Sequence, residues 1–284
     1  MKKILTASGF ILLYLAVYYI ITSNITVFFL LAYLIKEVIS DPAMISNGGF
    51  AYALRGSIDP LIKATILLQS ISAVVSFFAY WFISWARKQN FFQVCTFKKT
   101  HPANYLASVL LGISLLLPIS LLIKLFSIDK LSSDSQELMN SIINGNSLFI
   151  AILGIGILAP IIEEVIFRGL ILTELKKITA IPAAIIIQGM LFGIYHGNLQ
   201  QAIYASVLGI VLGYVCVKTG SLFCSILVHI FFNTTSLLMD RVFSEIVSEV
   251  PNGASSVMFL SVSITFIFAG FTILQVINRN RESI

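Results

Sequence analysis

Six side chains whose chemistry could serve catalysis stand inside long apolar stretches in the second half of the sequence, where ionisable groups are costly to hold and indicate a functional site. They are Glu163, Glu164, Arg168, His196, His229 and Asn233. Peptide-bond hydrolysis needs an activated water, a proton donor for the leaving amine and hydrogen-bond donors for the oxyanion. Carboxylate, imidazole and amide groups can supply all three functions.

The two adjacent carboxylates are expected to have different roles, because neighbouring helical residues point about 100° apart. Arg168 follows Glu164 by four residues, the spacing of an ion pair along one helix face. We therefore expect Glu164 and Arg168 to form a structural pair. Glu163 is then the residue expected to take a proton from the attacking water.

Three side chains on later helices complete the expected catalytic set. His196 is expected to hold the water, and His229 with Asn233, four residues apart on one face, to donate hydrogen bonds to the oxyanion. Zinc is the alternative, with Glu163, His196 and His229 as ligands and a fourth position open. Since no H-E-x-x-H motif is present, we favour glutamate chemistry without a cofactor.

Helix lengths allow these groups to meet. If the runs 148–172 and 180–197 form a hairpin turning near Ala180, Glu164 and His196 lie the same number of residues from the turn. Each is then roughly 24 Å along its helix, at a similar depth. Phe192, one turn before His196, is expected to pack against the site.

Composition predicts the environment, since 58% of the residues are hydrophobic and only 11% are charged. Soluble proteins carry about 25% charged residues. Apolar runs long enough to span a bilayer predict an all-α polytopic membrane protein with about eight transmembrane helices. The runs lie near 4–34, 61–84, 103–126, 148–172, 180–197, 201–217, 220–239 and 254–277. The whole chain, 1–284, is expected to be one integral membrane domain, with the catalytic helices in about 148–240.

Basic residues predict the orientation, because Lys and Arg are retained in cytoplasmic loops. One crossing by the first run, rather than a hairpin broken at Ser23-Asn24, places most basic loop residues inside with both termini. The expected location is the cell membrane. The net charge of +5 is spread over short loops, so no nucleic-acid partner is expected.

Other features have structural explanations. Cys95, Cys216 and Cys224 lack the spacing of a disulfide framework or thiolate metal site and are expected to pack between helices. His101 is expected to be a structural loop residue. The glycines of Gly154-x-Gly156 and Gly209-x-x-x-Gly213 are expected to allow close helix packing. Residues 131–136 and 144–145 are expected to be loop connectors.

The polar motifs resemble those of a known family. Glu163-Glu164-x-x-x-Arg168, Phe192-x-x-x-His196 and His229-x-x-x-Asn233, in that order, look like the motifs of the CAAX prenyl-protease and bacteriocin-processing family (CPBP, also called ABI). The resemblance spans about residues 148–240. It implies an intramembrane protease with an eight-helix core, in which Glu163, Glu164, His196, His229 and Asn233 match catalytic positions and Arg168 the conserved basic one. The expected partners are membrane lipid and a membrane-associated peptide or protein substrate.

Two other functions compete with proteolysis. An inactive relative would serve in bacteriocin self-immunity or as a scaffold. An ion-coupled transporter would also hold acidic and histidine side chains in its helices. Paired interrupted segments in the two halves, which would favour a transporter, are not evident in the sequence.

Overall fold

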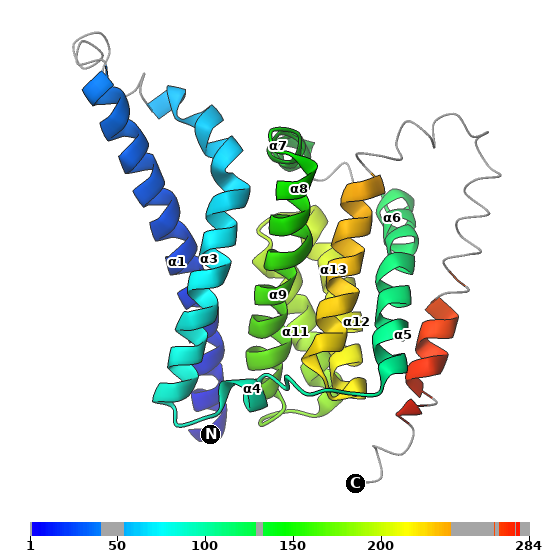
Figure 1. The fold of residues 1–284 in the computed structure, drawn as a ribbon. Coiled ribbons are helices and arrows are strands. Elements are labelled where there is room, and N and C mark those ends of the chain that lie inside the picture. Colours follow the sequence, from blue (N-terminus) through cyan, green and yellow to red (C-terminus); the bar gives the residue numbers. More distant parts are fainter. Residues whose placement is uncertain are drawn as a thin grey trace, which may run out of the picture.

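The computed structural model describes residues 2–40, 54–128, 133–239, 264, 267–275 and 277–278, and every regular element within them is a helix (Figure 1). Five helical stretches in these residues are long and apolar enough to cross a membrane. They are Lys2–Ser40, Ile58–Ala86, Pro102–Ile123, Leu148–Leu175 and Leu199–Thr219. Ile181–Tyr195 and Leu222–Leu238 are shorter apolar helices. The predicted all-α, multi-pass membrane fold is confirmed.

The first expected run is one continuous helix, α1 (Lys2–Ser40), which packs beside α3 (Ile58–Ala86). At the suspected break, the Asn24 side chain donates to the carbonyl of Ile20, at 2.8 Å, so this amide is satisfied within its own helix. The hairpin alternative for this run is therefore wrong.

The segment between α3 and the catalytic helices contains α4 (Phe91–Val94), α5 (Pro102–Ser114), α6 (Leu116–Leu125) and α7 (Ser133–Asn144). The break between α5 and α6 follows from Pro118, which has no N–H for the Ser114 carbonyl. The connector prediction for 131–136 is wrong from Ser133 onward, since α7 begins there. Ile142 and Ile143 of α7 pack against a small core cluster, which explains its helical order.

The helix that carries the glutamate pair is continuous but alternates between α-helical segments and wider π-helical segments. It consists of α8 (Leu148–Ala151), the π-helical η3 (Ile152–Leu158), α9 (Ala159–Glu164), the π-helical η4 (Val165–Ile171) and α10 (Leu172–Leu175). Pro160, which lacks an N–H, follows the first widened segment. Such π segments frequently interrupt α-helices at functional sites, and here they flank Glu163 and Glu164 on both sides.

Three further helices enclose this one: α11 (Ile181–Tyr195), α12 (Leu199–Thr219) and α13 (Leu222–Leu238). Helices α11 and α12 approach closely, since a Cβ on Gly209 would lie 2.9 Å from the Cα of Gly189. A Cβ on Gly154 would overlap a methyl group of Ile66 on α3. The packing roles predicted for these glycines are confirmed.

The remaining structural predictions also hold where they are described. His101 caps α5, its Nδ1 accepting from the N–H of Ala103 at 3.3 Å. Cys95, Cys216 and Cys224 are buried and form no disulfide. The eighth expected run, 254–277, lies mostly outside the described residues, and its described residues, 264, 267–275 and 277, are helical.

Candidate active site

Glu164 lies at the centre of the polar cluster and is completely buried. Its Oε1 accepts from Nη1 of Arg168 at 2.7 Å and from Nδ1 of His229 at 2.9 Å. The side chains of Glu164 and Arg168 are both 0% exposed. The ion pair expected from the four-residue spacing is present, and the same carboxylate also orients His229 from α13.

Arg168 has further partners that the sequence did not indicate. Its Nη2 donates to the carbonyl of Gly209 at 3.1 Å, and Nε2 of Gln188 donates to the same oxygen at 2.8 Å. The guanidinium carbon lies 4.4 Å from the ring centre of Phe192, a cation–π contact. The close approach of α11 and α12 brings these groups together, so the cation is fixed from three sides. A lone glutamine in an apolar run was the available signal for Gln188.

His229 lies between the two carboxylates. Its Nε2 is 3.7 Å from Oε2 of Glu163, too long for a hydrogen bond but close enough for electrostatic attraction. Its Nδ1 must carry a proton, because the Glu164 oxygen that also accepts from Arg168 can serve only as an acceptor. Donation from Nε2 to an oxyanion therefore requires the doubly protonated ring. Glu163 is the more accessible carboxylate, with 18% of its side chain exposed against 0% for Glu164.

His196 is at the end of α11, where Gly197 takes a left-handed conformation (φ 74°) and turns the chain into α12. Its Nδ1 lies 2.8 Å from the carbonyl oxygen of Phe192, so this nitrogen is the donor and a neutral ring leaves Nε2 to accept. The Phe192 ring meets His196 edge-on at 4.8 Å and His229 at 5.6 Å. The Phe192 ring therefore packs between the two histidines.

Asn233 faces the catalytic helix one turn after His229, as the shared helix face predicted. Its Nδ2 donates to the carbonyl of Ile155 at 3.0 Å. In the widened η3 segment this carbonyl would bond to the N–H of residue 160, which is proline. Asn233 therefore replaces a missing backbone donor, and only its second N–H is available to a substrate.

The expected zinc ligands do not form a metal-binding group. In the described part of the chain, no three His, Cys, Asp or Glu side chains have a geometry that could hold a metal ion. His196 is turned toward the Phe192 carbonyl, and His229 is held by Glu164. As arranged, Glu163, His196 and His229 do not fit a three-ligand zinc site.

Aromatic side chains near Glu163 were also missed by sequence reasoning. The phenols of Tyr18, Tyr195 and Tyr204, from α1, α11 and α12, lie within electrostatic range of its carboxylate. Tyrosine is common in apolar helices, and these three belong to no recognisable motif. Only the packing of the helices brings these three side chains within range of one carboxylate.

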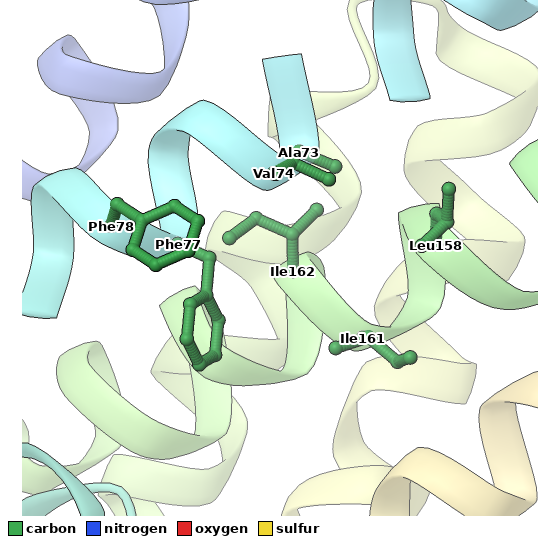
Figure 2. Close-up of a pocket in the computed structure, with 7 residues that line it drawn as sticks. All are labelled: Ala73, Val74, Phe77, Phe78, Leu158, Ile161 and Ile162. Atoms are coloured by element: carbon green, nitrogen blue, oxygen red, sulfur yellow. The ribbon is translucent and has the colours of Figure 1, made fainter. Parts of the chain in front are cut away.

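An apolar pocket of about 250 Å³ lies beside the turn that precedes Glu163 (Figure 2). Its walls come from α3 and from the end of η3 with α9. The lining residues are Ala73, Val74, Phe77, Phe78, Leu158, Ile161 and Ile162. Val74 and Phe78 are also exposed on the outer surface of α3, so the pocket lies between the catalytic helix and the apolar exterior.

Comparisons with known proteins agree with the motifs. Residues 145–235 match the family model described as type II CAAX prenyl endopeptidase Rce1-like. Over 115 residues the chain is 27% identical to a Bacillus subtilis (strain 168) protein described as "Putative membrane peptidase YdiL". That alignment covers 40% of this chain and 46% of the relative, so it spans less than half of each. No solved structure matches significantly.

The family match contains every residue of the polar cluster described above. The matched segment, 145–235, includes Glu163, Glu164 and Arg168 of the catalytic helix. It also includes His196 at the end of α11 and His229 on α13. Residues 145–235, which hold the polar cluster, are therefore similar to type II CAAX prenyl endopeptidases, in agreement with the family that the motifs resemble.

Proposed function

We propose that this protein is an intramembrane endopeptidase that cleaves a membrane-associated peptide or protein with a water molecule activated by Glu163. The observation that carries the proposal is the unequal environment of two adjacent carboxylates. Glu164 is held by Arg168 and His229, whereas Glu163 is partly exposed and has only a long contact with His229. A carboxylate without a fixed hydrogen-bonded partner is the one able to accept a proton from water.

In the proposed reaction the water oxygen attacks the carbonyl carbon of the scissile peptide while Glu163 takes one water proton. Nε2 of His196, an acceptor in the neutral ring, orients the water through its second hydrogen. Doubly protonated His229 and the second N–H of Asn233 donate to the oxyanion. Glu163 then returns the proton to the leaving nitrogen as the C–N bond breaks, giving a carboxylic acid and an amine.

The surroundings of the cluster support a membrane-anchored substrate. The pocket between α3 and α9 offers only apolar side chains next to the turn before Glu163. It would accept an apolar side chain or anchor of the substrate, while the peptide bond reaches the polar cluster. We propose that the protein lies in a cell membrane with both termini on the cytoplasmic side. Its proposed partners are membrane lipid and the substrate, and no nucleic-acid partner is proposed.

The test is cleavage of a panel of membrane-tethered peptides by the purified protein in lipid vesicles, with products identified by mass spectrometry. The proposal predicts at least one defined cut by wild type and none by Glu163→Ala. Binding of a peptide without cleavage would instead support an inactive immunity or scaffold protein. Peptide-independent proton movement across the vesicle membrane would support a transporter.

A further inference from the structure

The first helix has one face fixed against the rest of the protein through Tyr14. This side chain is 1% exposed, and its hydroxyl accepts a hydrogen bond from Nη1 of Arg87. The backbone carbonyl of Tyr14 accepts from the hydroxyl of Tyr80 on α3, at 2.7 Å. The rotation of α1 about its axis is therefore set at this turn.

An ion-pair cluster holds the same turn of α1 against the catalytic helix. Nη2 of Arg87 lies 2.8 Å from Oε1 of Glu174, which is 3% exposed and also pairs with Lys177 at 2.8 Å. The guanidinium of Arg87 stacks 3.4 Å above the ring centre of Phe10 on α1. Helix α10, which contains Glu174, continues directly from η4. The contacts of Arg87 with Glu174 and Phe10 therefore fix the position of α1 relative to the helix that carries Glu163.

Tyr18 lies one turn after Tyr14 and therefore on the same face of α1. Its ring is 5.9 Å from that of Tyr195, which in turn packs 5.5 Å from Phe167 on the catalytic helix. Tyr195 directly precedes His196 in the sequence. The adjacent Tyr19, by contrast, is 69% exposed and points away from the protein core.

We propose that Tyr18 is a substrate-binding residue whose hydroxyl donates a hydrogen bond to a main-chain carbonyl of the peptide bound beside Glu163. This inference rests on the proposed function. It extends the site to α1, which lies outside the matched segment 145–235. The fixed turn at Tyr14 supplies the rigidity that such a contact needs, because a donor on a freely rotating helix would lose most of its binding energy to ordering.

The test compares Tyr18→Phe with Tyr19→Phe, which removes the same hydroxyl from the exposed neighbour. With a cleaved peptide from the panel, Tyr18→Phe should lower kcat/KM by about 2- to 12-fold, the range for one hydrogen bond, chiefly by raising KM. Tyr19→Phe should match wild type. Thermal unfolding of both variants should also match wild type, since each keeps the ring.

A second readout does not depend on turnover. Benzoylphenylalanine placed at position 18 in a Glu163→Gln background should photo-crosslink to the peptide, and at position 19 it should not. Equal kcat/KM for Tyr18→Phe and Tyr19→Phe, or equal crosslinking from both positions, would overturn the role of Tyr18 while leaving the protease intact. A wild-type protein that cleaves no peptide would overturn the proposed function, and with it this inference.

Discussion

Replacing Arg168 by alanine tests whether the buried ion pair holds the site together. The substitution removes the 2.7 Å bond to Glu164, the 3.1 Å bond to the Gly209 carbonyl and the contact with the Phe192 ring. Both charged side chains are 0% exposed, so the Glu164 carboxylate would keep only its bond to His229 and would have no water to replace the guanidinium. Removing one member of such a pair costs about 3 to 5 kcal/mol, and we expect a loss of that size.

The assay is unfolding of the purified protein in detergent, by heat and by denaturant, together with the folded yield. Arg168→Lys should recover only part of the loss, because an ammonium group cannot reach two acceptors as a planar guanidinium does. Lys63→Ala is the control, since it breaks an ion pair of the same spacing with Asp59 at the exposed surface and should change little.

A partner substitution identifies the source of the loss. If the cost comes from a buried carboxylate that has lost its guanidinium, Glu164→Gln combined with Arg168→Ala should be more stable than Arg168→Ala alone. Wild-type stability of Arg168→Ala would refute the structural role of the pair. Strictly additive effects of the two substitutions would show that the side chains do not depend on each other.

Three other predictions concern packing and chemistry. Gly209→Ala should cost about 1 to 3 kcal/mol in thermal unfolding, because its Cβ would meet Gly189 of α11; an unchanged melting temperature would argue against the close helix contact. Asn104 and Asn278 exchange hydrogen bonds at 3.0 and 3.3 Å, so alanine at either should destabilise by about 0.6 to 1.7 kcal/mol. The double variant should lose less than the sum of the two single variants, because the shared bonds are lost only once. Exhaustive chelation of the wild-type protein should leave its cleavage rate unchanged. Two results together would favour the metal mechanism: one zinc per wild-type chain that is absent from His196→Ala, and activity of the chelated wild type that returns when zinc is added.

Much of the fold was predictable because its determinants are local. The apolar runs define the helices, and the four-residue spacing of Glu164 and Arg168 was enough to predict their pair. The continuity of α1 past Asn24 followed from counting basic residues in loops. Helix α7 was missed because its first turns, from Ser133 to Glu137, are polar, and this pattern resembled a loop.

The parts of the site that could not be predicted depend on packing between helices. Nothing in the sequence indicates that Gln188 and Arg168 share one carbonyl, since this depends on the close approach of α11 and α12. The binding of Asn233 to the Ile155 carbonyl depends on the π-helical widening before Pro160. Pro160 is visible in the sequence, but a proline is compatible with either a kinked helix or a π-helical turn. The sequence does not distinguish between these two structures.

The most direct test of the glutamate mechanism is the single-turnover cleavage rate of Glu163→Gln in lipid vesicles, measured in water enriched with ¹⁸O. Glutamine keeps the shape of glutamate but cannot accept the proton, so the rate should fall at least about 100-fold. Glu137→Gln, an exposed carboxamide substitution on α7, should match wild type and place one ¹⁸O in the new terminal carboxylate. A Glu163→Gln protein that keeps more than about a tenth of the wild-type rate, with normal ¹⁸O incorporation, would contradict the assignment of Glu163 as the base.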